Sequence, residues 1–246
     1  VEYGGYWDGI NIHKTGTGNL TMSNCTVSRS SANGLRINGS TGIHTITDCT
    51  FSNNAQNGLV INNDGNSAVN ASGCTFDSNN YGIYQTSNQT IDYSLNTFTA
   101  NTTASVAVEG GTVNTNIIWS PGLDAATTFN ILGNLTVASG SKLIVLQGTT
   151  VTFNANIVLY VKGTLDARGT LESPITFTGS TPSPNWWNSI YIQDPGSATL
   201  DYCTVSCGGY WDGANVNMSG TGSLSITNST LSYSGADGIW LRDDLG

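Results

Sequence analysis

The chain has 246 residues, of which 38% are hydrophobic and 9% are charged, and its formal net charge is -9. Only seven residues are Lys or Arg, too few to form the basic surface that binds nucleic acid or an anionic membrane. No apolar run is long enough to cross a bilayer, so we expect no membrane insertion. The acidic, Lys-poor composition, rich in Gly, Ser, Thr and Asn, is typical of a secreted, extracellular or cell-surface protein.

A short pattern recurs from the first residues onward. Cys or Ser is followed by Thr, an aromatic or branched residue, a polar stretch, a Gly and an alternating apolar strand. Gly9, Gly34, Gly58 and Gly82 belong to four copies, spaced 25, 24 and 24 residues apart. Each interval fits two or three short strands and contains no helical apolar period. Because one such unit cannot bury its own apolar face, the pattern predicts stacked units, a right-handed parallel β-helix of about ten coils.

Stacking predicts which side chains share a column inside the solenoid. Equivalent strands of neighbouring coils would pair at about 4.8 Å, which aligns residues one repeat apart. The expected inward columns are Cys25/Cys49/Cys74, Val27/Phe51/Phe76/Phe98 and Leu35/Leu59/Ile83. We interpret the cysteines as small buried apolar groups, because the chain lacks the paired CxxC spacing of a metal site.

The residue that precedes each repeated Gly is usually Asn or Asp. The members of this set are Asp8, Asn33, Asn57, Tyr81, Asp212 and Asp237. In a functional interpretation, these residues would form a row of carboxylates and amides along successive coils. As structure, they would be turn residues that tolerate a left-handed backbone, and this second interpretation is the one we favour.

The coil type changes in the middle of the chain. Pro and Gly interrupt the pattern at residues 119–128, and both residues end strands. From residue 129 onward apolar triplets recur at intervals near eight residues. We therefore expect wide coils over 1–118, a break, tighter two- or three-sided coils over 129–185, and wide coils again over 186–246.

A second, longer repeat relates residues 1–42 to residues 205–246, with 19 of 42 positions identical. Both copies contain Gly-Gly-Tyr-Trp-Asp-Gly, so the chain would start and stop within one module. The first residue is Val1, so we expect a processed chain or a fragment. Without caps, exposed strand edges would template further strands, and copies would stack head to tail into open filaments.

The stretches 133–137, 148–153 and 173–178, followed by the coil at 197–205, carry a resemblance to a known family. They resemble the bacterial secreted right-handed parallel β-helix repeat proteins of the pectate-lyase-like solenoid superfamily, and the likeness covers nearly the whole chain. The resemblance implies the fold. It leaves the function open, because this family includes polysaccharide lyases, tail-spike depolymerases, adhesins and structural surface proteins.

Catalytic residues of the kinds used in this family are not grouped in the sequence. A lyase would need clustered acidic residues for calcium with an Arg or Lys base, and a glycosidase would need two carboxylates about 5–10 Å apart. Glu2, Glu109 and Glu172 are isolated from one another. Asp64 lies in an Asn-Gly-rich turn that needs no metal. We expect no catalytic site, no metal and no cofactor.

The binding candidates are the aromatic pairs of the long repeat, Tyr6-Trp7 and Tyr210-Trp211. Aromatic faces stack on sugar rings, so each pair could contact carbohydrate. Alternatively, each pair packs over its own coil edge or against a neighbouring subunit. An ice-binding face would need Thr at fixed offsets on every coil, and the segments 20–22 and 45–47 do not align as such an array.

These features predict a non-enzymatic structural protein of the cell surface or of an extracellular fibre, assembling end to end from copies of itself. The alternatives are an adhesin or carbohydrate-binding spacer, and a fragment of a polysaccharide lyase or hydrolase.

Overall fold

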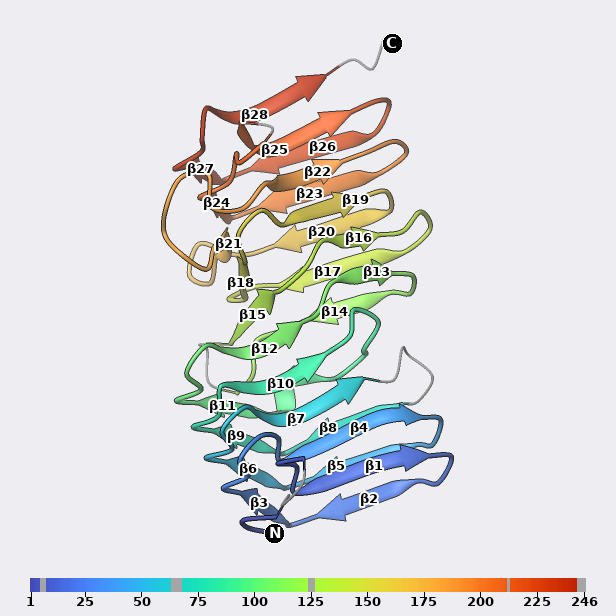
Figure 1. Ribbon diagram of the computed structural model, residues 1–246. Helices are drawn as coiled ribbons and strands as arrows, with labels where there is room; N and C mark the ends of the chain where they lie inside the picture. The colour runs from blue at the N-terminus through green and yellow to red at the C-terminus, as the bar shows by residue number, and fades with distance from the viewer. Residues whose placement is uncertain (5–7, 63–67, 124–126, 212, 243–246) are drawn as a thin grey trace. The chain divides into compact units, whose positions relative to one another are not determined.

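The computed structural model describes residues 1–4, 8–62, 68–123, 127–211 and 213–242. Over this part of the chain the structure is almost entirely β, with one short 3-10 helix, η1 (Tyr93–Leu95). The chain divides into two compact units (Figure 1): unit 1 comprises residues 1–109 and 120–129, and unit 2 comprises residues 110–119 and 130–246. The expected all-β parallel solenoid is confirmed, with about nine turns in total against the ten or so expected.

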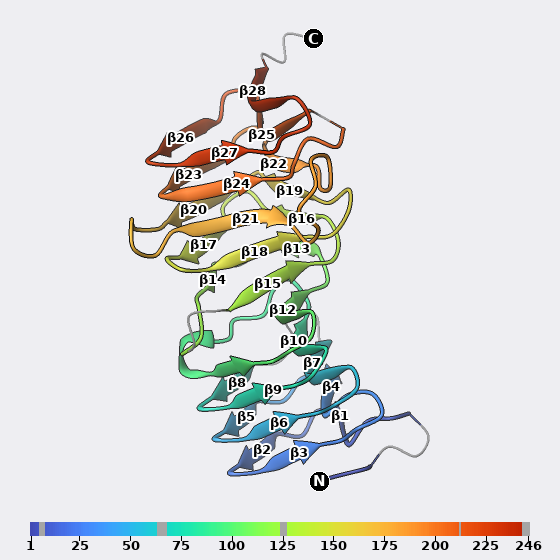
Figure 2. The ribbon, with the colours of Figure 1, turned by 90° about the vertical axis from the view of Figure 1, so that its left-hand side faces the viewer.

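Unit 1 has three parallel sheets, which we call faces 1, 2 and 3 (Figure 2). Successive strands of one turn belong to successive faces, so the chain visits each face once per turn. Face 1 contains β1 (Ile12–Gly16), β4 (Leu35–Ser40), β7 (Asn57–Asn62), β10 (Tyr81–Gln85) and β12 (Ala104–Val108). Face 2 contains β2 (Leu20–Ser23), β5 (His44–Thr47) and β8 (Val69–Ser72), and face 3 contains β3 (Thr26–Ser28), β6 (Thr50–Ser52), β9 (Thr75–Asp77) and β11 (Thr97–Thr99).

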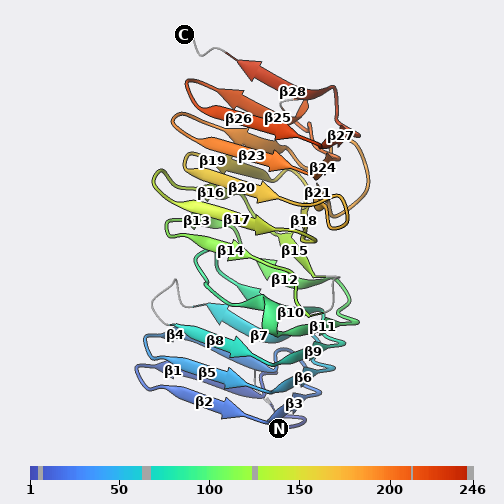
Figure 3. The same ribbon diagram turned by 180° about the vertical axis from the view of Figure 1, so that it is seen from behind.

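Unit 2 repeats this arrangement, and its face 2 is turned toward the viewer in Figure 3. The long repeat makes the four strands over residues 214–242 the equivalents of β1 to β4, and we number the faces of unit 2 accordingly. Face 1 contains β13 (Gly111–Val113), β16 (Leu135–Val137), β19 (Val158–Val161), β22 (Ser189–Ile192), β25 (Ala214–Ser219) and β28 (Asp237–Arg242). Face 2 contains β14 (Ile117–Trp119), β17 (Lys142–Leu146), β20 (Thr164–Arg168), β23 (Ser197–Asp201) and β26 (Ser223–Thr227). Face 3 contains β18 (Thr150–Phe153), β21 (Ile175–Gly179), β24 (Cys203–Ser206) and β27 (Thr230–Ser232), and the division between the units runs through β15 (Thr128–Ile131).

The inward columns expected from the repeat are confirmed by the strand register. Val27, Phe51, Phe76 and Phe98 align one turn apart, and so do Leu35, Leu59 and Ile83. The Phe76 ring stacks between its two neighbours, with centroids 5.2 Å from Phe51 and 5.3 Å from Phe98. Because the turns are in register, side chains of the same type contact one another in adjacent turns and fill the core closely.

The cysteines form the expected column. The backbone N–H of Thr50 donates to the carbonyl of Cys25, and that of Thr75 donates to the carbonyl of Cys49, which fixes the register of the three thiol-bearing residues. Cys49 and Cys74 are buried, Cys25 is partly exposed, and all five cysteines are free thiols. Burial raises the pKa of the Cys74 thiol to about 11, which keeps it neutral and unreactive.

The expected left-handed position is wrong for the residues before the repeated glycines. Asn33, Asn57, Tyr81 and Asp237 do not have positive φ, and Asp212 lies outside the described residues. The left-handed residues stand elsewhere in each turn, just before the cysteine column and just after face 3. In unit 1 they are Asn24 and Asp48 in the first set, and Arg29, Asn53, Ser78 and Ala100 in the second. In unit 2 the corresponding residues are Tyr202 and Asn228, and Cys207 and Tyr233, while Tyr3, Asn156 and Asn185 are left-handed outside these sets.

The repeated Gly has a steric role instead. A Cβ on Gly58 would lie 2.7 Å from the carbonyl oxygen of Gly82 one turn on, and Gly34 has the same relation to Gly58. At Gly34 and Gly58, neighbouring turns therefore approach one another too closely for a side chain. A positive φ is found only at the outer copies Gly9 and Gly213.

The expected tighter coils over residues 129–185 are not smaller turns. Gly111 pairs with Leu135 and Leu135 with Leu159, 24 residues apart in each case, as Leu35 and Leu59 are in unit 1. The shorter interval seen in the sequence separates consecutive strands of one turn, which lie on different faces. The turn size does change at the next step, where Leu159 pairs with Ile190, because the loop at 180–188 is inserted there.

Candidate functional site

Only part of the expected aromatic contact site is described. Tyr6 and Trp7 lie outside the described residues, as does Asp64 of the Asn-Gly turn. Tyr210 and Trp211, in the other copy of the long repeat, stand in the turn that leads from β24 into β25.

The Tyr210-Trp211 turn presents both rings to solvent. Tyr210 is 44% exposed and Trp211 is 76% exposed, so Trp211 does not pack over its own coil edge. The two rings meet edge to face, with centroids 5.2 Å apart and an interplanar angle of 89°. Aromatic pairs favour this geometry, so each ring limits the movement of the other.

Backbone contacts hold the turn in place. The N–H of Gly209 donates to the carbonyl of Asn188 at 2.6 Å, and the N–H of Tyr210 donates to that of Trp187 at 3.2 Å. Gly209 has φ +99°, and a Cβ there would lie 2.6 Å from the backbone nitrogen of Gly235. Trp187 is itself buried and stacks on Phe153 at 4.1 Å. The turn that carries Tyr210 and Trp211 is therefore hydrogen-bonded to a well-packed part of unit 2.

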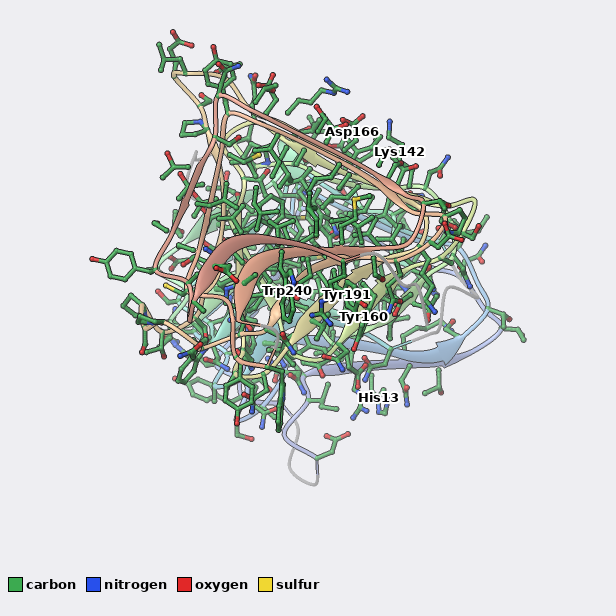
Figure 4. All side chains as sticks on the ribbon, turned by 90° about the horizontal axis from the view of Figure 1, so that it is seen from above. His13, Lys142, Tyr160, Asp166, Tyr191 and Trp240 are labelled. Atoms are coloured by element: carbon green, nitrogen blue, oxygen red, sulfur yellow. The ribbon has the colours of Figure 1, made fainter. Side chains whose placement is uncertain are left out.

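A second aromatic surface was missed by the sequence analysis. On face 1 of unit 2, Tyr160 pairs with Tyr191, Tyr191 with Asn217, and Asn217 with Trp240. Viewed from above (Figure 4), Tyr160, Tyr191 and Trp240 lie on the same side of the solenoid, away from Lys142 and Asp166. We call Tyr160, Tyr191, Asn217 and Trp240 the outward column.

Ring contacts link the members of this column. The Tyr160 and Tyr191 centroids are 6.0 Å apart. The guanidinium carbon of Arg242 lies 3.8 Å from the Trp240 ring centroid and 5.9 Å from that of Tyr191, both within the range of a cation–π interaction. The sequence signal for this surface is an aromatic residue between two inward aliphatic residues, as in Leu159-Tyr160-Val161. It could be recognised as a column only once the register was known.

A group of three charged side chains lies on face 2 of unit 2. The Asp166 carboxylate lies 2.7 Å from the Lys142 ammonium and 2.7 Å from the Arg168 guanidinium. Partial burial alone would raise the pKa of Asp166, but the hydrogen bonds from Lys142 and Arg168 outweigh it and hold that pKa below its ordinary value. Within the described residues, no three His, Cys, Asp or Glu side chains meet as a possible metal site.

As expected, face 2 of unit 1 carries no regular Thr column, because Thr45 pairs with Thr21 on one side and with Asn70 on the other. Regular Thr columns do occur on face 3, which the sequence comparison did not consider. The register aligns Thr26, Thr50, Thr75 and Thr97 in one outward column on face 3 of unit 1. In unit 2 the equivalent column is Thr150, Thr176, Thr204 and Thr230. The segments compared in the sequence belong to face 2, where Thr21 aligns with Thr45 and not with Ile46.

The Thr columns have a structural explanation, because β-branched side chains suit the outward positions of strands. The hydroxyl column beside the Thr column does not make a flat face. In unit 1 it is interrupted by Asp77. In unit 2, Thr178 and Ser206 lie in a pocket of about 380 Å³ that Pro182 and Tyr233 also line.

Of the comparisons with known proteins, the one with protein families found a match, and it concerns the fold. The family model described as the right-handed β-helix region matches residues 3–165. No curated protein and no solved structure matches the chain. None of the described segments forms a helix of the length and hydropathy needed to cross a membrane.

Proposed function

Because the chain belongs to the right-handed β-helix family, we propose that it is a non-enzymatic extracellular or cell-surface scaffold that binds carbohydrate through exposed aromatic side chains. The observation that carries this proposal is the Tyr210-Trp211 pair, whose Trp211 ring is 76% exposed on an anchored turn. Contiguous exposed apolar surface marks contact surfaces, whereas single exposed apolar residues are ordinary, and here two adjoining rings are exposed together. Indole and phenol rings offer flat apolar faces with a polar edge, which suits the C–H face and the hydroxyl rim of a pyranose ring.

The arrangement of charges supports a non-enzymatic role. Cleavage of a glycosidic bond needs two carboxyl groups flanking one bond. Asp166 is instead placed between the cations of Lys142 and Arg168, and the Glu2 carboxylate lies 3.4 Å from Arg29. These are surface ion pairs of an ordinary structural kind. Calcium-dependent release of unsaturated sugars by the protein would overturn this part of the proposal and indicate a lyase.

A glycan array probed with the whole chain tests the proposal. We expect Trp211→Ala to weaken binding to the retained glycans by at least about tenfold, since a central aromatic anchor contributes that much or more. Leu171→Ala is the matched control, because Leu171 is 75% exposed but offers no ring. Retention of no glycan, or equal binding by the Trp211→Ala variant and the wild type, would contradict the proposal.

Head-to-tail assembly into a fibre stays a prediction, as does secretion. Electron microscopy of the purified chain checks the first. Uniform filaments with a subunit rise on the order of 50 Å, the summed height of the turns at the usual strand spacing, would support it. Monodisperse short rods would exclude it.

A further inference from the structure

We infer that Cys25 and Cys49 form a redox-active pair, which a hydroperoxide converts into a disulfide between two adjacent turns of unit 1. Formation of this disulfide does not depend on carbohydrate binding, so it goes beyond the proposed function. The two cysteines occupy equivalent positions of neighbouring turns, and one is partly exposed while the other is buried. Alignment combined with unequal access to solvent is what makes the pair suited to this reaction.

The strand register brings the two cysteines together. Thr26 of β3 pairs with Thr50 of β6, and each cysteine stands directly before its threonine. The two strands lie side by side (Figure 2), and the backbone N–H of Thr50 donates to the carbonyl of Cys25 at 2.8 Å. Paired strands lie about 4.8 Å apart. A disulfide spans Cα–Cα separations of about 4.4–6.8 Å, so adjacent turns place the two residues within its reach.

Both side chains point in the same direction. The Cys25 thiol donates to the Ser23 carbonyl at 3.3 Å, and the Cys49 thiol donates to the Thr47 carbonyl at 3.2 Å. Because each thiol bonds the backbone two residues earlier, the two Cβ vectors do not point apart, which is the second condition for a disulfide. Burial raises the pKa of the Cys49 thiol, and the Cys25 thiol beside it also raises that pKa. The two sulfurs therefore lie close enough to interact.

Unequal exposure gives the two thiols different roles. Cys25 is partly exposed, whereas Cys49 is 1% exposed, so hydrogen peroxide reaches Cys25 first. The Cys25 thiolate attacks one peroxide oxygen, the O–O bond breaks, and the departing hydroxide takes up a proton to become water, which leaves a sulfenic acid. The Cys49 sulfur then attacks the Cys25 sulfur. The S–S bond forms, the S–O bond breaks, and the hydroxyl leaves as water with the Cys49 proton.

The third cysteine of the column is not suited to the same reaction. Cys74 is 1% exposed, and burial raises its pKa to about 11, so it is shielded from the oxidant and remains protonated. Its thiol has two backbone acceptors, the carbonyls of Ser72 and Ile46, both at 3.5 Å. We therefore expect Cys49 to react with Cys25 and not with Cys74.

The long repeat supplies a matched position without a thiol pair. The equivalent of Cys25 is Ser229, which the register places beside Cys203. The Ser229 hydroxyl donates to the Thr227 carbonyl at 2.7 Å, as the Cys25 thiol donates to the carbonyl two residues before it. A hydroxyl at this position thus preserves the local hydrogen bond, and Cys25→Ser is expected to fold as the wild type does.

Treatment of the whole reduced chain with hydrogen peroxide, followed by blocking of free thiols and peptide mass spectrometry, tests the inference. We expect a crosslinked peptide that contains Cys25 and Cys49, has lost the mass of two hydrogen atoms and is separated again by dithiothreitol. Oxidation should raise the Tm by about 5 °C, because the bond closes a loop of one whole turn, and reduction should reverse the rise.

Three variants assign the chemistry to the two sulfurs. Cys25→Ser should show neither the crosslink nor the rise in Tm. In Cys49→Ala, oxidation of Cys25 should stop at the sulfenic acid, which dimedone traps. Cys74→Ala is the matched control, because it removes a buried thiol of the same column, and it should form the crosslink as the wild type does.

Several outcomes would overturn the inference. They are a crosslink between Cys49 and Cys74, a crosslink between two copies of Cys25, oxidation of Cys25 to sulfinic acid without a crosslink, and absence of any oxidation at Cys25. A crosslinked chain with an unchanged Tm would show that the bond does not stabilise the turns that it joins. The glycan array with Trp211→Ala decides the proposed function separately, since neither cysteine belongs to the Tyr210-Trp211 turn.

Discussion

The backbone N–H of Leu20 donates a hydrogen bond to Nδ1 of His44, one turn further along face 2, at 3.2 Å. A backbone N–H can only donate, so the ring proton of His44 is on Nε2, which lies 2.9 Å from the Ser40 hydroxyl. That hydroxyl in turn donates to the Gly16 carbonyl at 2.7 Å. His44 is 0% exposed and joins adjacent turns as a neutral imidazole.

This geometry predicts that unit 1 loses stability in mild acid. Burial, and then the charge of Lys14, lower the pKa of His44 below 6.5. The unfolded chain therefore binds a proton more readily than the folded one, and the full stability is present above about pH 6.5 and is lost as the pH falls below it. We expect the Tm to fall from about pH 7 to pH 5, within the range in which histidine titrates. In His44→Gln this dependence should be largely absent. An equal dependence in both proteins would contradict the prediction.

The stacked ring of Phe76 should be among the most costly to truncate. Phe76 is 0% exposed and contacts Phe51 and Phe98 on its two sides. We expect Phe76→Ala to lower the free energy of unfolding by about 3–5 kcal/mol, because it opens a cavity in a core that cannot collapse around it. Denaturant titration measures the loss. Thr75→Ala, at the adjacent outward position, is the control and should cost less than about 1 kcal/mol.

The steric role of the repeated Gly can be separated from its conformational freedom. We expect Gly58→Ala to destabilise the protein by about 1–3 kcal/mol through overpacking, because the added Cβ would lie 2.7 Å from the Gly82 carbonyl oxygen. A Cβ on Gly18 would meet nothing within 4 Å, and no positive φ restricts that residue. Gly18→Ala should thus be neutral or slightly stabilising. Similar effects of the two substitutions in thermal unfolding would refute the steric interpretation.

The cysteine column should be protected from alkylation. With excess maleimide at about pH 8, near the ordinary pKa of a thiol, Cys25 should react first because it is partly exposed. Cys74 is 1% exposed and burial raises its pKa to about 11, so it should react only after unfolding. Peptide mass spectrometry with and without denaturant distinguishes the two sites. Rapid labelling of Cys74 in the folded protein would show that the column opens.

The repeat was predictable because equivalent residues of successive turns recur at a nearly constant interval in the sequence. Phe51, Phe76 and Phe98 could be assigned to one column from their spacing alone, and the register confirms that assignment. The turn size over residues 129–185 could not be assigned in this way. Apolar triplets such as those at Leu135, Leu143 and Val151 look the same whether they belong to one face or to three, and only strand pairing separates the two cases.

Of the two aromatic surfaces, one could be recognised in the sequence and the other could not. Trp211 was identifiable from the sequence because two large aromatic residues stand together between glycines in a turn. The outward column was not, because Tyr191, Asn217 and Trp240 are far apart in the sequence and the intervals between them are unequal, since loops of different length join the strands. The Thr column of unit 1 has the same spacing as the Phe column beside it, and it was missed because the sequence comparison used segments of face 2.

By itself, the sequence determined the all-β solenoid and its inward columns, since both depend on residue type and regular spacing along the chain. Only the tertiary structure decided where the left-handed residues stand, why the repeated Gly is needed, and which outward side chains become neighbours. Those properties depend on how one turn lies on the next. Contacts between turns are set by the hydrogen-bonded register, which a change in loop length shifts without altering the local pattern of either strand.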